Sequence, residues 1–288
     1  MDLSIIEIVN EILKDQDKAF EIALKYNILP ARNRSLVCPK CGHFMEYNIN
    51  SDKWKCHNYK CSTSRSCTYP FDIQKNHFQK FLACLFFFGA DIPIYEAVKI
   101  SNISSQIIER NYKQFREKVH MSYQNMMQTK TLSFHVQIDE SCFGKRKYNR
   151  GRIGNGVVWI FGACDATPGG NVYMIPVLHR DANTLIPIIQ SWCPPGCIIN
   201  SDCWAAYNNL DNYGFAHFTV NHSTNFVNPI TLEHTQRIES LWRSAKNFLR
   251  KHHYISHQHI EEYVAEWCFR YNNNYDTFQI IQKISSIN

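Results

Sequence analysis

The sequence of residues 134–139 is Phe134-His135-Val136-Gln137-Ile138-Asp139, a strict alternation of apolar and polar side chains. Successive side chains of a β-strand point to opposite faces of a sheet, so this alternation predicts a strand. Its polar face carries His135, Gln137 and Asp139. We therefore expect a strand that ends on a carboxylate.

Further strands and helices follow this strand. The continuous apolar run of residues 157–164 predicts a central strand that is covered on both faces. Later segments predict strands over 172–177, 197–201 and 217–220, a helix over 184–192, a short helix over 204–210, and long helices over 235–252 and 259–271. Strands first, and then strands alternating with helices, indicate an α/β fold with a mixed sheet flanked by helices.

The residues that precede this sheet differ from it in composition and in the spacing of their apolar side chains. Residues 3–26 have the apolar spacing of one or two amphipathic helices, and residues 36–72 are rich in Cys, Lys and Ser. Residues 75–127 look helical, with a break at Ser101-Asn102 that resembles a helix-turn-helix. We expect this helical segment to bind DNA.

Composition excludes several classes of protein. The 288 residues are 44% hydrophobic and 19% charged, as in globular proteins, and the net charge of +6 permits a nucleic-acid partner. The longest apolar run, Phe81 to Ala90, is half of the roughly 20 residues that a membrane span needs, so no membrane partner is expected. The N-terminal residues lack the pattern of a secretory signal, so we expect the twelve cysteines to be reduced.

Four cysteines have the spacing of metal ligands. Cys38 and Cys41 form one close pair, and Cys56 and Cys61 form a second. Two such pairs supply the four thiolates of a structural Zn²⁺ site, and Gly42 suits the turn after the first pair. Cys67 and His57 are possible substitutes as ligands. Four unrelated buried thiols, or two disulfides, are the alternative interpretations.

Three carboxylates form a second set. Asp139 ends the predicted strand 134–139, Asp202 directly follows the strand 197–201, and Glu239 lies early in the helix 235–252. If the two strands are neighbours, both aspartates lie at one end of the sheet. Converging carboxylates repel one another unless a divalent cation such as Mg²⁺ or Mn²⁺ neutralises them. Two such ions about 3.5–4 Å apart can catalyse phosphoryl transfer.

Each carboxylate alone has an ordinary alternative. Asp139 could be a turn residue, Asp202 could cap the short helix that follows it, and Glu239 could pair with Arg243 one turn on. The evidence lies in their order, with 62 residues between the aspartates and 36 between Asp202 and Glu239.

Six ordered blocks of residues 131–252 resemble the catalytic domain of the Merlin superfamily of DDE transposases and their bacterial insertion-sequence relatives. The blocks are Ile138-Asp139-Glu140-Ser141, residues 145–152, Trp159-Ile160-Phe161-Gly162, residues 201–207, Val220-Asn221-His222-Ser223 and residues 234–242. The segment from Cys38 to Thr68 also resembles the zinc ribbon that precedes that domain.

This resemblance implies a ribonuclease-H-like fold and metal-dependent cleavage and transfer of DNA strands. It implies that Asp139, Asp202 and Glu239 are the catalytic triad and hold Mg²⁺ or Mn²⁺. Its implied partners are the terminal inverted repeats, target DNA and further copies of the chain. The expected parts are an N-terminal helical segment (1–35), a zinc ribbon (36–72), a helix-turn-helix-like segment (73–130), the catalytic domain (131–256) and a C-terminal helix and tail (257–288).

The leading hypothesis is thus a DNA transposase that hydrolyses phosphodiesters at element ends and joins them to target DNA. The alternatives are a domesticated DNA-binding relative without transposition activity and another ribonuclease-H-like nuclease, such as a junction resolvase. The Asn-rich composition favours a eukaryotic source and the nucleus, whereas a bacterial source would place the protein in the cytoplasm with the nucleoid.

Basic residues surround the predicted triad. The cationic loop, defined as Lys145, Arg146, Lys147, Arg150 and Arg152, is expected to bind DNA phosphates, or else to be a solvated turn. Arg243, Lys246 and Arg250 share the helical face of Glu239 and are expected to bind DNA, with a solvated stripe as the alternative. His222 either positions substrate or is a polar loop residue. The aromatic residues Trp204, Tyr207 and Trp242 are expected to pack in the core.

Overall fold

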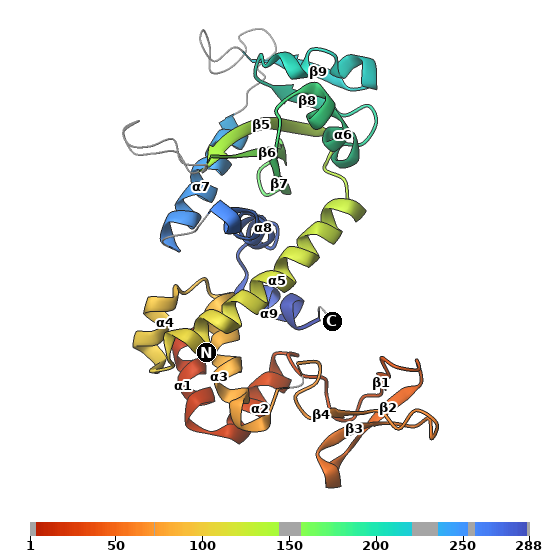
Figure 1. The fold of residues 1–288 in the computed structure, drawn as a ribbon, viewed down its shortest axis with the longest axis vertical. Coiled ribbons are helices and arrows are strands. Elements are labelled where there is room, and N and C mark those ends of the chain that lie inside the picture. The colour runs from red at the N-terminus through yellow and green to blue at the C-terminus, as the bar shows by residue number, and fades with distance from the viewer. Residues whose placement is uncertain (1–3, 72, 144–156, 221–235, 253–256, 287–288) are drawn as a thin grey trace. The chain divides into compact units, whose positions relative to one another are not determined.

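The structure is a computed structural model that describes residues 4–71, 73–143, 157–220, 236–252 and 257–286. The chain forms two compact units (Figure 1). Unit 1 comprises residues 1–115 and 276–288, and unit 2 comprises residues 116–275. Helix α5 (Ser105–Thr129) contributes to both units.

A mixed five-stranded sheet forms the centre of unit 2. Its strands are β5 (His135–Phe143), β6 (Val158–Asp165), β7 (Val172–Val177), β8 (Ile198–Ser201) and β9 (Ala216–Thr219). The spatial order is β7-β6-β5-β8-β9, with antiparallel pairing from β7 to β5 and parallel pairing from β5 to β9. The predicted mixed α/β fold is therefore confirmed.

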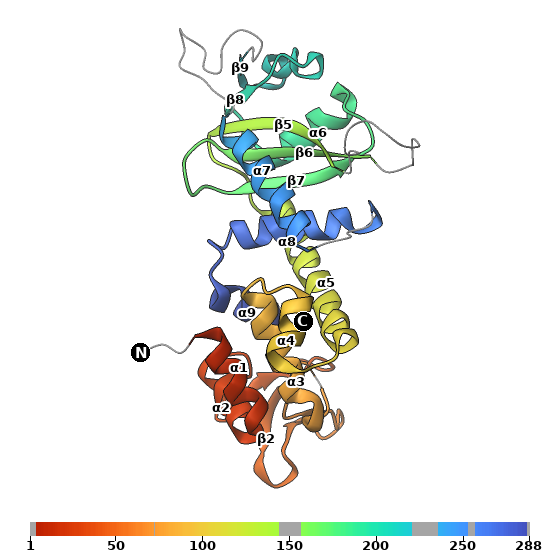
Figure 2. The ribbon, with the colours of Figure 1, turned by 90° about the vertical axis from the view of Figure 1, so that its left-hand side faces the viewer.

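Helices cover both faces of this sheet. They are α6 (Ala182–Trp192), α7 (Gln236–Lys251) and α8 (Ile260–Tyr271), with short 3₁₀ segments η3 (Ala205–Tyr207), η4 (Leu210–Tyr213) and η5 (His257–His259). Helix α7 crosses over β5 and β6 (Figure 2), because its apolar residues recur at helical spacing and bury Ile238 and Trp242 on the sheet. On the opposite face, Trp192 of α6 stacks on Phe161 with ring centroids 5.6 Å apart.

Two sequence expectations for unit 2 are wrong. Strand β5 continues four residues beyond Asp139, because β6 pairs with it as far as Phe143 opposite Val158. Asp139 therefore lies inside a strand and not at its end. Residues 204–210 do not form one short helix, because the chain turns twice there, in η3 and η4.

The polar face of β5 is buried, because it supports the start of α7. Gln137 is 1% exposed, and its side-chain oxygen accepts hydrogen bonds from the backbone N–H groups of Arg237 and Ile238, both at 3.1 Å. The first N–H groups of a helix lack partners within the helix, so Gln137 satisfies two of them. This pairing anchors α7 over the middle of β5.

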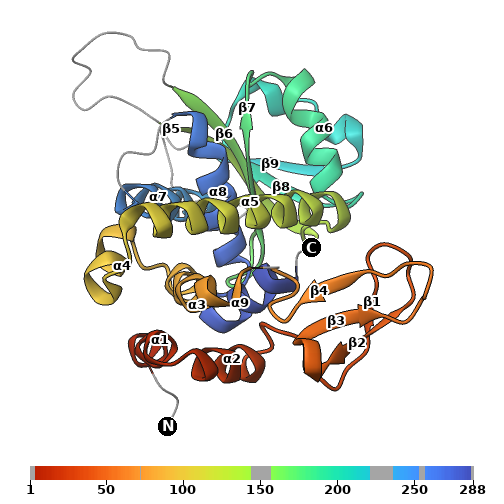
Figure 3. The ribbon, with the colours of Figure 1, turned by 60° about the horizontal axis from the view of Figure 1, so that its bottom comes forward.

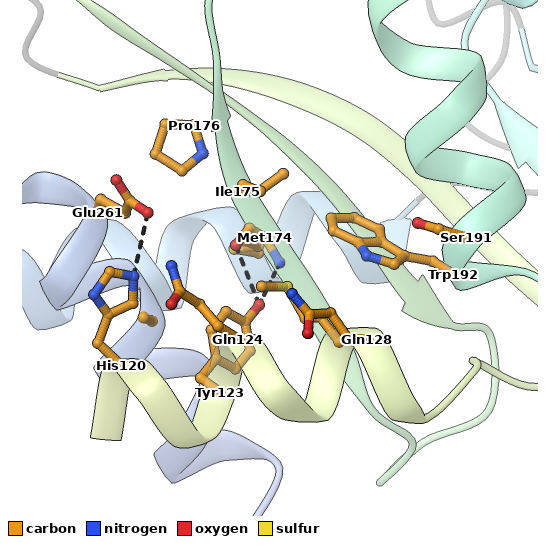
Figure 4. Close-up of a pocket in the computed structure, with 12 residues that line it drawn as sticks. His120, Tyr123, Gln124, Gln128, Met174, Ile175, Pro176, Ser191, Trp192 and Glu261 are labelled. Carbon is orange, nitrogen blue, oxygen red and sulfur yellow. Dashed lines mark hydrogen bonds and ion pairs between the residues drawn. The ribbon is translucent and has the colours of Figure 1, made fainter. Parts of the chain in front are cut away.

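Side chains occupy the free edge of β7. Asn272 exchanges two hydrogen bonds with the backbone of Val172, at 2.8 and 2.9 Å, and the Tyr123 hydroxyl exchanges two with Met174, at 2.7 and 3.1 Å (Figure 4). Pro176 follows and has no N–H to donate. This edge is therefore closed to pairing with another strand. The adjoining cavity of about 460 Å³ is lined by none of the three predicted carboxylates.

Unit 1 combines helices with a small antiparallel sheet (Figure 3). Its helices are α1 (Ile5–Lys14), α2 (Gln16–Lys25), α3 (Lys75–Gly89), α4 (Ile94–Ser101) and α9 (Thr277–Ser286), together with the first part of α5. Its strands are β1 (Leu36–Val37), β2 (Phe44–Asn48), β3 (Lys53–Cys56) and β4 (Ser64–Ser66), with η1 (Ile49–Ser51) between β2 and β3. Helix α3 is central because its apolar run is buried on all sides.

Helix α9 lies in the segment expected as a C-terminal helix and tail (257–288), and it packs in the core of unit 1. Phe278 stacks on Tyr26 with ring centroids 4.7 Å apart, and Ile281 packs closely against Gly89. The predicted break between two helices lies at Asn102, which has a φ of 56° and ends α4. No helix among the described residues is long and apolar enough to span a membrane.

Gly162 of β6 allows α7 to approach the sheet. An added Cβ at this position would lie 2.6 Å from a ring carbon of Trp242. We expect Gly162→Ala to lower the free energy of unfolding by about 1–3 kcal/mol, because overpacking forces neighbours out of place. Urea unfolding followed by circular dichroism would measure the change.

The matched control for this prediction is Gly162→Ala in a Trp242→Phe background. A phenyl ring lacks the outer indole carbons that the new methyl group would meet, so the cost of Gly162→Ala should fall there. An equal cost in both backgrounds would contradict the predicted clash.

Candidate functional site

Asp139 lies on β5, and Asp202 directly follows the adjacent parallel strand β8. Strands β5 and β8 pair in the register His135 with Ile198 and Gln137 with Asn200. Both aspartates come two residues after this last pair, and the charge of Asp202 acts on Asp139. The neighbouring strands that the sequence interpretation required are therefore confirmed, although β5 does not end at this point.

Asp139 is held by two donors and is surrounded by negative charge. One carboxylate oxygen accepts a hydrogen bond from Trp242 Nε1 at 2.9 Å, and the other accepts one from the backbone N–H of Glu140 at 2.8 Å. Burial, with smaller contributions from the negative charges of Asp202 and Glu239, raises the pKa of Asp139 to about 6. The three predicted carboxylates are thus electrostatically coupled.

Asp202 is positioned by a turn and by the neighbouring strand β9. Its Oδ1 accepts a hydrogen bond from the backbone N–H of Trp204 at 2.9 Å, so the predicted capping role is also present. The Ser201 hydroxyl bonds the Asp202 carbonyl at 2.7 Å and lies 2.8 Å from His217 Nε2. Asp202 Oδ2 accepts no hydrogen bond from any described residue.

Glu239 lies in the exposed first turn of α7. Among the described residues, the three carboxylates do not form a group as tight as the four cysteines do. Their oxygen atoms are nevertheless the ligands that Mg²⁺ prefers, and the negative charge of Asp202, and to a smaller extent that of Glu239, adds to burial in raising the pKa of Asp139. The donor set therefore fits a divalent cation.

Glu140 is a residue that sequence reasoning missed. Strand alternation turns it to the face opposite Asp139, where it accepts a hydrogen bond from the Tyr207 hydroxyl. Burial and the charges of Asp139 and Asp202 raise the pKa of Glu140 to about 7, against the Tyr207 hydrogen bond and the charge of Arg180. The one feature of the sequence that could have pointed to Glu140 is its position directly after Asp139.

The basic residues that were predicted to bind DNA differ in exposure and in hydrogen-bond partners. Arg243 is exposed, whereas Lys246 Nζ donates to Ser141 on β5 at 2.6 Å, and Arg250 donates to Asn247 at 2.6 Å. The cationic loop and His222 lie outside the described residues.

Of the three aromatic residues expected in the core, two are buried and one is exposed. Tyr207 and Trp242 are buried as expected, at 0% and 5% exposed. Trp204 is 40% exposed, so its assignment to the core is wrong, because the tight turn after Asp202 holds it at the surface. Trp242 does more than pack, since it donates to Asp139.

The four predicted cysteines converge in the small sheet of unit 1. Their sulfur atoms all lie within 4.8 Å of one another. Cys38 and Cys41 lie in the turn between β1 and β2, in which Gly42 has a φ of 73°. Cys56 is the last residue of β3, and Cys61 lies in the connection that follows it. This arrangement could hold Zn²⁺.

The thiols are suited to binding a metal. Although burial opposes it, the N–H groups of Lys40 and Cys41 lower the pKa of the Cys38 thiol to about 6. All twelve cysteines are free, and the shortest sulfur distances in the group, 3.5 and 3.8 Å, are too long for disulfides of about 2.05 Å. Cys67 lies outside the group, and His57 pairs with Glu46 at 2.9 Å.

Comparison with known proteins finds relatives among transposases. Residues 131–272 match the ISXO2-like transposase domain. The chain is 35% identical over 103 residues to an uncharacterized transposase-like protein of Haemophilus influenzae, a match that covers 36% of this chain and 82% of that protein.

The match to a chain in a crystal structure of a pre-cleavage Mos1 transpososome covers 64% of this chain and 74% of that chain. The two chains are 9% identical in sequence, and the TM-score is 0.25. That likeness is too low to bear on the fold. The domain match and the 35% identical relative carry the assignment. The chain belongs to the family of transposase-like proteins that contain an ISXO2-like transposase domain.

Proposed function

We propose that the protein is an active DNA transposase, which hydrolyses phosphodiesters at the ends of its element and transfers the ends to target DNA. The observation that carries this proposal is the position of Asp139 on β5 and of Asp202 directly after the adjacent parallel strand β8, within an ISXO2-like transposase domain. Glu239, in the first turn of α7, is proposed as the third carboxylate because of its order in the sequence motif.

Asp139, Asp202 and Glu239 would hold Mg²⁺ or Mn²⁺, which when bound would supply Lewis-acid and water-activating chemistry. Trp242 and the Glu140 backbone orient the Asp139 carboxylate, and the Trp204 backbone orients that of Asp202. These donors keep both aspartates in place before DNA arrives, so little side-chain reorganisation accompanies binding.

The finer family and fold are part of the proposal. The sheet order, in which three antiparallel strands are extended by two parallel ones, supports a ribonuclease-H-like domain. The six sequence blocks support a place in the Merlin superfamily. We further propose that the four cysteines bind one structural Zn²⁺ and that the ribbon and the α4–α5 helices contact DNA, with several copies of the chain acting together.

The direct test uses the DNA that flanks this gene on both sides. Labelled flanking fragments are incubated with the purified chain, Mg²⁺ and a supercoiled target plasmid. We expect cleavage at a defined position in each flank and joining of the new 3′ ends to the plasmid. Binding to the flanks without cleavage in Mg²⁺ or Mn²⁺ would support a domesticated DNA-binding protein instead.

The cationic loop is expected to contribute to the salt dependence of DNA binding. Replacing Lys145, Arg146 and Lys147 together by Ala should flatten the plot of log K against log salt by about one unit for each lost phosphate contact. The control replaces Lys14, Lys18 and Lys25 of α1 and α2, which removes the same charge elsewhere. If both triple variants change the slope equally, net charge and not the loop explains the affinity.

A further inference from the structure

Arg180 lies between two tryptophans in the segment that joins β7 to α6. Its guanidinium carbon is 3.6 Å from the ring centroid of Trp159 and 4.9 Å from that of Trp204. Trp204 Nε1 also donates to the Arg180 carbonyl at 2.9 Å. A cation over the face of an indole is attracted by the ring, so the two tryptophans restrain the guanidinium.

The N–H donors of this arginine make no hydrogen bond or ion pair within the part of the chain that the structure describes. Its guanidinium contacts the two indole rings. A guanidinium carries five N–H donors in a flat fork that matches a phosphate or carboxylate. A ring contact uses the face of the guanidinium and not these donors.

This arginine adjoins the acidic site. Trp204, which contacts Arg180, is bound through its backbone N–H to Asp202 at 2.9 Å. The positive charge of Arg180 also reaches Glu140, which follows Asp139. Strand register places Trp159 on the same face as Glu140 and on the face opposite Asp139. The link from Arg180 to the acidic site therefore runs through Trp204 to Asp202, and not across the sheet face that carries Asp139.

We propose that Arg180, in contact with Trp159 and Trp204, is a phosphate-binding residue that holds a DNA strand near the turn that follows Asp202. The inference rests on the proposed function and adds a DNA contact that lies outside the carboxylate set. The carboxylates repel a phosphodiester, so a cation close to Asp202 would offset part of that repulsion for the strand that enters. Trp204 is 40% exposed, so a strand can reach this contact from solvent.

The test measures the affinity of the full chain for a duplex oligonucleotide of arbitrary sequence at several salt concentrations. Arg180→Met keeps a long side chain between the indoles but removes the charge and the donors. We expect it to weaken binding about tenfold and to reduce the salt slope by about one. Arg180→Lys should keep the slope and lose a smaller part of the affinity, because an ammonium cannot form the flat fork.

Two further variants complete the design. Lys130→Ala removes an exposed charge of unit 2 and should bind like the wild type. Trp204→Leu keeps every charge but removes one stacking face, so it should lower affinity without changing the slope. Thermal unfolding of each variant identifies any loss of affinity that comes from loss of the fold.

The outcomes separate this inference from the proposed function. If the wild type binds and cleaves flanking DNA while Arg180→Met behaves like it in affinity, slope and cleavage rate, the phosphate contact is refuted and the transposase proposal stands. If the wild type neither binds nor cleaves DNA, the proposed function is refuted, and the phosphate contact falls with it.

Discussion

We expect Asp202→Asn to abolish cleavage of the flanking DNA in Mg²⁺ while leaving DNA binding close to that of the wild type. Asparagine keeps the shape of the side chain, and its oxygen can still accept the Trp204 N–H. The carboxamide lacks the charge that holds a hard divalent cation, so a rate loss of at least about 10³-fold is expected. Gel assays of cleavage and anisotropy assays of binding measure the two effects separately.

Asp139→Asn and Glu239→Gln should have the same effect for the same reason. Asp139→Asn also retains an oxygen for Trp242 Nε1, so the fold around β5 should survive. The matched control is Asp211→Asn, because the Asp211 side chain accepts the backbone N–H of His217, at 3.1 Å, and an amide oxygen can do so too. We expect this control to cleave at the wild-type rate.

Wild-type cleavage by Asp202→Asn or Glu239→Gln would show that the three-carboxylate mechanism is wrong. Loss of cleavage together with a lowered melting temperature would indicate unfolding, and the milder Asp202→Glu variant then becomes the test. It restores the charge but displaces it, so weak cleavage that rises when Mn²⁺ replaces Mg²⁺ is expected.

The second large effect concerns the ribbon. We expect about one zinc per chain, and none in the Cys38→Ser, Cys41→Ser double variant. The apolar core of this small sheet is slight, with Met45 and Trp54 as its fully buried members apart from the cysteines. Metal binding should therefore supply most of its folding free energy, about 10–16 kcal/mol in comparable zinc sites.

Metal analysis and limited proteolysis measure this effect. The double variant should be cut rapidly within residues 36–72, whereas unit 2, which contains none of these four cysteines, should resist. Cys67→Ser is the control, since Cys67 lies outside the metal-sized group, and it should keep its zinc. An unchanged zinc content in the double variant would contradict the assignment of the ligands. The triad variants should also keep their zinc, because thiolates and carboxylates select different metals.

The sequence determined those features that depend on local periodicity and spacing. The alternation of residues 134–139 predicted a strand, and the apolar run at 157–164 predicted the covered strand beside it. The two cysteine pairs predicted a four-thiol group, because each pair needs only one tight turn to bring its sulfurs together. The order of the three carboxylates, read together with the neighbouring blocks, indicated the transposase family that the comparisons show.

Tertiary structure decided which surfaces and partners these elements acquired. Alternation along β5 cannot tell how far β6 pairs with it, so Asp139 was expected at a strand end and lies inside the strand. Periodicity also made Trp204 a core residue, but the turn capped by Asp202 holds it at the surface beside Arg180. Glu140 acquired its burial and its Tyr207 partner only through packing on the other face of the sheet. Each of these outcomes depends on contacts between residues far apart in the chain, and a local pattern carries no record of such contacts.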